Sequence, residues 1–577
     1  MSEFKTFLTF FEKSEKIKFF FMSLSFFFLA IIEAFGIALI FPVVGMFQNN
    51  NFINETQNDL ILFITNLSNF INPNLDILIS FTILFGLIYL FKTILSFVIQ
   101  SYQINYVWNI QKKLENKLFK NYLFSPYELH IDRQSSNLLK NIIQETSKVG
   151  NTILSSAYLI SSTATILMIL ALMFLIDPLI SLASLLIFFL TNLFVFFNTR
   201  KLITKIGENR YDFNEKRIEF YSTGINNIKD IKVNEQENIF INLTKKFNEK
   251  YFNSEKKINI INILPILITE FVFIIGVIII LHYINLLSQN GINDFIPKLS
   301  VFIAASIKLI PSVNKAAIMI NKIKYNFKAV NSIKFDLNLP LAKKATDKAK
   351  NLKLEEEIVI KDLNFKFNNG KQILDNVNLI IKKNTAICLY GPSGIGKSTL
   401  LDLMLGIIKP QSGDIYCDNH SIYESLGSWR KLVGFVPQNI NIFEDTLERN
   451  ITQNFRDEDV NKEKINEIIK LADLENFVNK LINNSKTIIR EKGKNISGGQ
   501  KQRIGIARAL AKKPKILILD EPTTGLDLDS KKKIYSTLSK LKKNMTIIIV
   551  SHDLKDINFC DHFYSFDESK KIKEKFN

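Results

Sequence analysis

An all-α membrane domain of six helices, fused to an α/β domain with a phosphate-binding loop, is the fold class that this 577-residue sequence predicts. Residues 1–330 contain six long apolar stretches, which predict membrane helices. Residues 391–398 match the phosphate-loop pattern G-x-x-x-x-G-K-S/T without a gap. Together these observations predict a transmembrane domain at 1–330, a linker at 331–352 and a nucleotide-binding domain at 353–577.

The apolar stretches are long enough to span a bilayer. They lie at residues 19–47, 76–104, 153–176, 179–197, 258–288 and 298–325. A helix needs about 20 mainly apolar residues to cross the hydrocarbon core, and most of the stretches reach that length. A buried helix of a soluble protein would explain any single stretch, but it does not explain six in series. Asp177-Pro178 separates the third stretch from the fourth and favours a tight turn there.

The distribution of Lys and Arg predicts the orientation in the membrane. Residues 48–75 and 283–297 contain neither residue type, whereas residues 105–150 and 198–257 contain both and are rich in Lys. The positive-inside rule therefore places both termini and the nucleotide-binding domain in the cytoplasm, and the chain in the inner (cytoplasmic) membrane as a multi-pass protein. The formal net charge of +18 has the same origin, and no nucleic-acid-binding module is present.

The basic cytoplasmic segments predict more than orientation. Charged, periodic extensions of the second to fifth helices would carry the chain well beyond the membrane, with short turns near Ser125–Gln134 and Tyr221–Asp230 that would touch the ATPase domains. The apolar segment Asn58–Ile64 predicts a helix on the outer membrane surface. Cys388, Cys417 and Cys560 all lie in the cytoplasmic domain, which fits a reducing compartment. No cleavable signal peptide is predicted.

The phosphate loop lies between a predicted strand, Thr385–Tyr390, and a predicted helix, Ser398–Gly406. Its glycines let backbone N–H groups turn toward the phosphates, and the helix adds its positive N-terminal end. Lys397 supplies a cation, and the Ser398 hydroxyl is a candidate Mg²⁺ ligand. A chance glycine-rich turn would lack this strand and helix. The candidate ATP-binding residues of the loop are Gly391, Ser393, Gly394, Gly396, Lys397, Ser398 and Thr399.

Two further strand ends carry candidate catalytic groups. Asp520 ends the apolar run that begins at Lys515, where its carboxylate can reach Mg²⁺, and Glu521 is placed to polarise the attacking water. His552 follows the apolar run Thr546–Ser551 and could contact the γ-phosphate. A His after a strand is more often structural, so its assignment depends on the other motifs.

Residues 353–577 resemble an ABC transporter nucleotide-binding domain along their full length. The pentapeptide Ile496-Ser497-Gly498-Gly499-Gln500 is similar to the ABC signature, which contacts ATP bound to a different subunit. The resemblance implies that Phe367 stacks on adenine and that Gln438 senses Mg²⁺ and the membrane domain. It also implies contacts of Glu491 with the partner's coupling helices and of Asp527 across the dimer. Glu521-Pro522-Thr523-Thr524-Gly525 departs from the common exporter sequence but keeps the acid.

Six helices with one ATPase domain resemble the half-transporter layout of type IV ABC exporters. This resemblance implies ATP and Mg²⁺ as cofactors and a homodimer in which each ATP site is shared, although a heterodimer stays open. A non-transport ABC protein would have paired ATPase domains and no membrane helices, so the six stretches argue against that class.

Charged residues inside the apolar stretches are the direct clue to a substrate. Lys92, Lys308 and Lys315 are the candidate substrate-cavity residues, and the last two lie seven apart on one helix face. Either they form a basic face for an anionic substrate, or Glu33 and Glu270 neutralise lysines, or Lys92 and Lys315 snorkel to the inner interface.

The stretches Ile32–Leu39 and Lys308–Lys315 resemble PglK-type lipid-linked oligosaccharide flippases, with Ile266 standing where another basic residue is expected. The resemblance implies ATP-driven export or flipping of an anionic lipid-linked oligosaccharide or polysaccharide precursor from the cytoplasmic to the outer leaflet. A multidrug, peptide or lipid A exporter of the same fold is the alternative.

Overall fold

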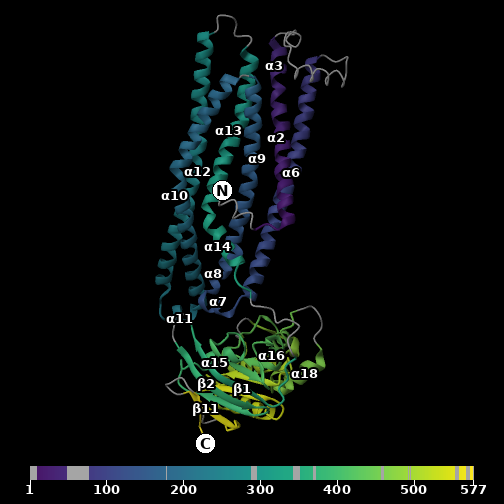
Figure 1. Ribbon diagram of the computed structural model, residues 1–577, viewed down its shortest axis with the longest axis vertical. Helices are drawn as coiled ribbons and strands as arrows, with labels where there is room; N and C mark the ends of the chain where they lie inside the picture. Colours follow the sequence, from purple (N-terminus) through teal and green to yellow (C-terminus); the bar gives the residue numbers. More distant parts are fainter. Residues whose placement is uncertain are drawn as a thin grey trace. The chain divides into compact units, whose positions relative to one another are not determined.

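The structure is a computed structural model that divides into two compact units. One comprises Met1–Ser125 and Leu129–Leu341, and the other comprises Pro126–Glu128 and Ala342–Asn577. The first is helical, and the second contains the β-sheets (Figure 1). The residues described are 10–48, 77–176, 178–287, 295–341, 351–367, 372–455, 461–490, 493, 495–552, 558–566 and 572–575.

The helical unit is built from long helices joined by short ones. The elements are α2 (Lys13–Ala38), α3 (Ile40–Gln48), α6 (Ile77–Phe124), α7 (Tyr127–Asp132), α8 (Ser135–Lys140), the π-helical turn η1 (Asn141–Glu145), α9 (Thr146–Ile176), α10 (Pro178–Asn226), α11 (Ile228–Val233), α12 (Glu237–Leu287), α13 (Phe295–Tyr325) and α14 (Phe327–Leu337). Among the described residues, five helices are long and apolar enough to cross a membrane. The predicted fourth stretch, 179–197, lies inside α10. The predicted outer surface helix at 58–64 lies outside the described residues.

Three helices extend well beyond a bilayer. Helices α6, α10 and α12 contain 48, 49 and 51 residues. At about 1.5 Å per residue each is more than twice as long as the hydrocarbon core of roughly 30 Å. The predicted extensions of the second, fourth and fifth helices are therefore confirmed, and the third continues before α9 through η1 and α8 as one run of 42 residues, Ser135–Ile176. The chain turns after Phe124 and again at Asn227, between α10 and α11, and both turns lie within or next to the predicted segments Ser125–Gln134 and Tyr221–Asp230.

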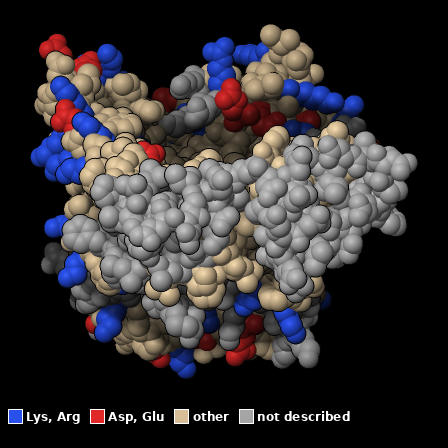
Figure 2. Space-filling model, turned by 90° about the horizontal axis from the view of Figure 1, so that it is seen from above, with Lys and Arg blue, Asp and Glu red and all other residues tan. Residues whose placement is uncertain are grey.

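The uncharged surface of the helical unit suits a lipid environment. In the most apolar window of α6 only 6% of the residues are buried inside the protein. In the view from above, the described Lys, Arg, Asp and Glu side chains lie mainly toward the outline (Figure 2). Because lipid is as apolar as a protein core, helices with exposed Leu, Ile and Phe are stable there.

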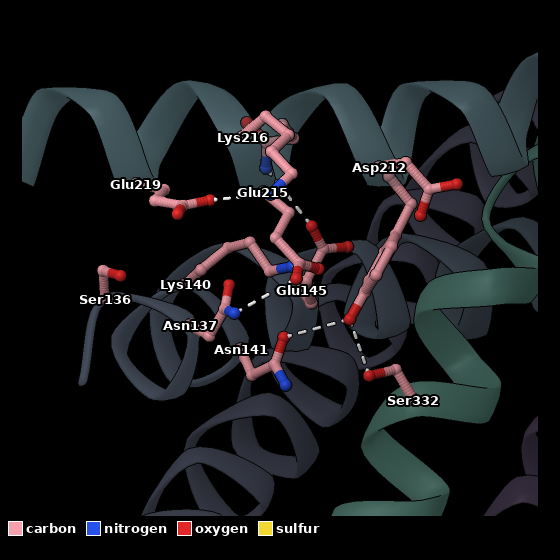
Figure 3. Close-up of polar contacts among 12 residues, drawn as sticks. Ser136, Asn137, Lys140, Asn141, Glu145, Asp212, Glu215, Lys216, Glu219 and Ser332 are labelled. Carbon is pink, nitrogen blue, oxygen red and sulfur yellow. Dashed lines mark hydrogen bonds and ion pairs between the residues drawn. The ribbon is translucent and has the colours of Figure 1, made fainter. Parts of the chain in front are cut away.

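A buried polar network joins the extensions of several helices (Figure 3). The Arg210 guanidinium on α10 donates to both carboxylate oxygens of Glu145 on η1, at 3.4 and 3.3 Å. Both side chains are at most 1% exposed. The Tyr211 hydroxyl bonds Asn141 at 3.4 Å and Ser332 on α14 at 2.8 Å. Since removing one partner would leave a buried charge unpaired, the network holds these helices in one arrangement.

Helix α14 occupies the first part of the predicted linker. Residues 331–337 belong to this helix, and the domain prediction that ended at residue 330 cuts through it. Two causes hold α14 in the helical unit. Ala329, Val330 and Ile333 are buried apolar side chains. Asp336 is 1% exposed and accepts hydrogen bonds from Asn141 and Arg133, each at 2.8 Å.

The second unit contains an antiparallel and a mainly parallel sheet. The antiparallel sheet has the order β2-β1-β4-β5, formed by β1 (Glu357–Lys366), β2 (Gln372–Lys382), β4 (Ser412–Cys417) and β5 (His420–Ser421). The six-stranded sheet has the order β12-β11-β3-β10-β9-β6, formed by β3 (Ala386–Tyr390), β6 (Val433–Val436), β9 (Ile516–Asp520), β10 (Thr546–Ser551), β11 (His562–Phe566) and β12 (Ile572–Lys575). Strands β3, β9 and β10 are continuous apolar runs because both sheet faces are covered. This confirms the three predicted strands.

Helices and a small sheet complete the unit. The helices are α15 (Lys397–Met404), α16 (Leu426–Leu432), α17 (Leu447–Thr452), α18 (Lys462–Leu471), α19 (Glu475–Val478), the short 3₁₀ turn η3 (Asn484–Lys486), α20 (Gly498–Leu510) and α21 (Leu528–Leu541). Strands β7 (Asp445–Thr446) and β8 (Ile488–Ile489) pair separately.

Candidate functional site

The predicted catalytic groups gather at one edge of the six-stranded sheet. Strands β11, β3, β10, β9 and β6 are parallel neighbours in that order. The carboxyl ends of β3, β9, β10 and β6 therefore lie at the same edge. The phosphate loop, Glu521, His552 and Gln438 follow these four ends directly or within two residues. Segments far apart in the sequence thus form a single site.

The phosphate loop is shaped by Gly396, which begins α15. Its φ of 119° lies in the region that glycine tolerates, and a Cβ there would approach Ile373 to 3.0 Å. Lys397 is 5% exposed, and its ammonium donates to the carbonyl oxygens of Gly391 at 2.7 Å and Pro392 at 2.9 Å. Burial lowers the pKa of Lys397, while the nearby Glu521 and Asp520 oppose that change. The cation is thus already held over the loop that would cradle a phosphate.

Glu521 is the centre of the catalytic cluster. Its carboxylate is 12% exposed and contacts the imidazole of His552. The amide nitrogen of Gln438 donates to the same carboxylate at 2.8 Å, and the Thr524 hydroxyl donates at 3.2 Å. The backbone of Glu521 has φ 46°, in the left-handed region that non-glycine residues seldom adopt. Its N–H donates to the Val550 carbonyl at 3.0 Å, which ties this turn to β10.

Asp520 and Ser398 bring together two hard oxygen donors. The Ser398 hydroxyl lies beside the Asp520 carboxylate and favours its ionised form. Burial, followed by the charge of Glu521, raises the pKa of Asp520 above its ordinary value. A hydroxyl and a carboxylate in contact fit Mg²⁺, which takes one or two protein ligands beside nucleotide phosphates. Gln438, the third predicted Mg²⁺ ligand, donates to the carboxylate of Glu521, the residue that follows Asp520.

Phe367 lies apart from these groups, directly after β1. Its ring packs edge-on against Phe365, with the centroids 5.0 Å apart, and it is partly buried against the core. The neighbouring residues 368–371 lie outside the described part of the chain. Stacking of Phe367 on adenine therefore stays a prediction.

The signature segment begins helix α20. Ser497 is the N-cap, and it forms a reciprocal capping box with Gln500, with bonds of 2.8 and 3.3 Å. A Cβ on Gly499 would approach the Ser530 hydroxyl to 2.9 Å, so a larger residue would disturb the contact with α21. Asp527 caps α21 by accepting from the Ser530 N–H at 3.1 Å, and hydrogen bonding by the Ser530 side chain, followed by this backbone bond, lowers the pKa of Asp527.

Three assignments stay predictions. These are the contacts of the signature residues with ATP on a second subunit, the part of Gly498 in those contacts, and the contact of Asp527 across the dimer. Glu491 lies outside the described residues.

In the membrane helices, Glu33 pairs with two of the three predicted lysines. Lys92 on α6 donates to its carboxylate at 2.9 Å, and Lys308 on α13 lies 3.5 Å away. The side chain of Glu33 is 12% exposed, that of Lys92 17% and that of Lys308 40%. The single charge of Glu33 can thus neutralise only one of the two lysines, and Lys308 is more accessible than Lys92.

Lys315 has a different environment. Its ammonium lies 4.1 Å from the centre of the Tyr158 ring on α9, an attractive cation–π geometry. Glu270 on α12 is exposed, and no ion-pair partner for it occurs among the described residues. Neutralisation by an acid therefore applies at Glu33, whose single charge Lys92 and Lys308 share, whereas Glu270 pairs with none of the described residues.

Three participants were not anticipated. Thr524 contacts the catalytic acid, and the carboxyl of Asp402 on α15 has its pKa raised to about 6 by burial and then by Asp520. Tyr158 could have been found as an aromatic residue in an apolar stretch, but nothing in its sequence position indicates its partner. These contacts depend on residues brought together from distant parts of the chain.

Comparison with known proteins supports the same organisation. The family model of the ABC transporter transmembrane region matches residues 25–304, and that of the ABC transporter matches residues 374–524. The chain is 37% identical over 219 residues to the ATP-dependent lipid A-core flippase of Pectobacterium atrosepticum. It is 32% identical over 308 residues to ABC transporter B family member 29, chloroplastic, of Arabidopsis thaliana. These matches cover 38% and 52% of this chain, and 38% and 47% of those proteins.

Similarity to a solved structure extends further. A bacterial Atm1-family ABC exporter with ATP bound has a TM-score of 0.77 and 18% identity, covering 97% of this chain and 94% of that chain. At this identity the comparison concerns the fold. The matching fold and the two family regions, which together cover well over half of the sequence, show that the chain belongs to the ABC transporters, with a helical transmembrane domain fused to an ABC nucleotide-binding domain.

Proposed function

We propose that the protein is an ATP-driven homodimeric exporter that flips an anionic lipid-linked oligosaccharide or polysaccharide precursor from the cytoplasmic to the outer leaflet. The anionic substrate class is inferred from the excess of positive charge around Glu33. Two lysines share this acid, and the exposed one, Lys308, lies one heptad from Lys315 on α13. Such positive charge is costly in a membrane unless it has a function.

ATP hydrolysis follows from the geometry of the sheet edge. The loop N–H groups and Lys397 bind the phosphates, and Mg²⁺ held by Ser398 and Asp520 would neutralise charge on them. Glu521 accepts hydrogen bonds from Gln438 and Thr524, which hold its carboxylate ready to orient a water molecule. His552 contacts the same carboxylate and can meet the γ-phosphate.

The shared ATP site is the reason for a dimer. Lys397, Asp520 and Glu521 of one chain would face Ser497 and Gly499 of the other, with Asp527 at the contact. The capping box leaves the N-terminal end of α20 preformed for an anion. A homodimer is the simplest assembly, because one chain supplies both halves of the site.

The relatives support a lipid substrate without specifying it. One is a lipid A-core flippase, but the chain matches only 38% of the length of that relative. The resemblance to PglK-type flippases and the positive charges of Lys308 and Lys315 favour a lipid pyrophosphate carrying a glycan. Export of lipid A is the second candidate, favoured by this relative.

The test is flipping of a labelled lipid-linked oligosaccharide in proteoliposomes by a Lys308→Ala/Lys315→Ala double variant. Each charge-assisted contact is worth about 1.5–3 kcal/mol. Because Lys308 is partly exposed and shares Glu33, we take the lower value, and the double variant should lose affinity about 100-fold. Basal ATP hydrolysis should persist.

Two controls make the result specific. The Lys308→Arg/Lys315→Arg variant keeps both charges and should retain most of the flipping. Lys256→Ala/Lys257→Ala removes two exposed charges from α12 and should have little effect. Flipping by the double alanine variant at the parent rate would reject the basic face. A parent protein that flips lipid A but not the oligosaccharide lipid would favour the second candidate.

A further inference from the structure

The helical unit contains a polar cavity of about 260 Å³ that is lined by α9, α12 and α13 and is partly open to the surface. Its polar lining includes Asn151, Tyr158, Asn259, Asn262, Lys322 and Asn326. Pockets for drug-sized ligands are typically about 300–1,000 Å³. The cavity is therefore too small for a whole lipid, and its size suits one ring-sized polar group.

The position of the cavity along the helices corresponds to the cytoplasmic interface. Its lining residues on α9 and α12 lie at the predicted cytoplasmic ends of the apolar stretches 153–176 and 258–288. Those on α13 lie at the end of the stretch 298–325. With the orientation given by the basic segments, the cavity lies level with the headgroups of the inner leaflet.

The lining carries a single net positive charge. Lys148 lies 3.5 Å from the Glu255 carboxylate, so these two compensate each other. Lys322 is exposed and has no ion-pair partner within the described ranges. Amides and hydroxyls make up most of the remaining polar lining, and these groups both donate and accept hydrogen bonds. Such a lining recognises hydroxyl-bearing groups better than a multiply charged one.

Asn326 supplies an unsatisfied acceptor. It is the N-cap of α14, a position where the side-chain oxygen of Asn normally accepts a backbone N–H. Here the side chain makes no capping bond, and its oxygen is buried without a hydrogen-bond partner. The residue is only 5% exposed. Because buried polar atoms are nearly always satisfied, this acceptor indicates a missing donor, such as a hydroxyl.

The cavity continues the basic face of α13. Lys308, Lys315 and Lys322 are spaced seven residues apart, which places them along one helix face. Tyr158 lines the cavity and also lies under the Lys315 ammonium, at 4.1 Å. If Lys308 and Lys315 bind a phosphate of the substrate, the group attached to that phosphate would therefore lie at the cavity.

We propose that the α9–α12–α13 cavity is a subsite for the first sugar next to the phosphates of the exported lipid. This inference rests on the proposed function and specifies where the neutral part of the headgroup binds. The amides of Asn151, Asn259 and Asn326 bond the sugar hydroxyls, and the phosphates stay with the lysines.

The experiment compares two lipids that differ only in the sugar. The full chain in nanodiscs is titrated with undecaprenyl diphosphate or undecaprenyl-diphospho-N-acetylglucosamine, and the half-saturating concentration for stimulation of ATP hydrolysis is measured. The parent should respond to the glycosylated lipid at the lower concentration. An Asn151→Ala/Asn259→Ala variant should lose this preference, since each lost hydrogen bond raises the half-saturating concentration about 3- to 10-fold.

Both substituted residues are exposed, so the variant should fold normally. Asn253→Ala, at an exposed position on α12 outside the cavity, is the matched control and should keep the preference. The response to the bare diphosphate should be the same in all three proteins.

The outcomes separate the two proposals. If both lipids stimulate the parent equally, or if the cavity variant keeps the preference, the subsite is rejected while the proposed function stands. If neither lipid stimulates the parent, the substrate class itself is wrong and the subsite falls with it.

Discussion

Glu521→Gln isolates the chemical role of the carboxylate from its role in holding the site together. The glutamine is nearly isosteric, and its amide can still bond Gln438, Thr524 or His552, which surround Glu521 in the structure. Only the negative charge and the basicity are lost. A positioned general base contributes about 10²- to 10⁴-fold to rate. The rate of phosphate release should fall by that factor, which corresponds to about 3–5 kcal/mol.

Nucleotide binding should respond in the opposite way. The Glu521 charge contributes to the raised pKa of Asp520, so it also repels other negative charge nearby. Removing it lowers the repulsion toward the triphosphate, while Lys397 and the loop N–H groups are unchanged. The ATP dissociation constant should therefore stay within a few-fold of the parent or become smaller. The variant should accumulate ATP-bound dimers.

The assay measures phosphate release and equilibrium binding of a fluorescent ATP analogue on the full chain in nanodiscs. Glu475→Gln, at the exposed start of α19, is the control for removing one carboxylate and should match the parent. Phosphate release by Glu521→Gln above one tenth of the parent rate would refute the general-base role. A large loss of ATP binding would show that Glu521 mainly maintains the phosphate site.

Three further predictions concern the nucleotide-binding domain. Lys397→Ala should weaken ATP binding at least about 10-fold, because it deletes the buried cation at the loop; unchanged binding of the analogue would contradict this. Mixing Lys397→Ala subunits with Ser497→Arg subunits should restore hydrolysis in some dimers through one intact shared site, and no recovery after proven subunit exchange would count against independent shared sites. Asp402 has a folded pKa of about 6 against an ordinary 3.8, so its ionisation costs stability as pH rises from about 4 to 6. Asp402→Asn should therefore raise the free energy of unfolding at pH 7 by about 1–2 kcal/mol, after allowing for solvent screening, and so raise the unfolding temperature; at pH 4 it should not. Equal gains at both pH values would show that ionisation of Asp402 is not the cause.

The sequence by itself determined the elements whose signals are local. A phosphate loop needs its glycines, Lys397 and Ser398 next to one another, and its strand and helix must flank it directly. The structure accordingly has β3 and α15 where they were predicted. Membrane helices depend in the same way on uninterrupted apolar composition, and the long extensions follow from the charged periodic segments beyond them.

The tertiary structure decided the partners of charged residues and the end of the helical unit. Glu33 is separated from Lys92 by 59 residues, and only the packing of helices α2, α6 and α13 shows that two lysines share it. Residues 331–337 have the polarity of a linker, yet they are helical and join the helical unit, where the buried Asp336 accepts hydrogen bonds from Asn141 and Arg133, more than 190 residues away in the sequence. Pairing energies of this kind depend on distance and burial, which are set by the packing of distant segments and leave no local pattern in the chain.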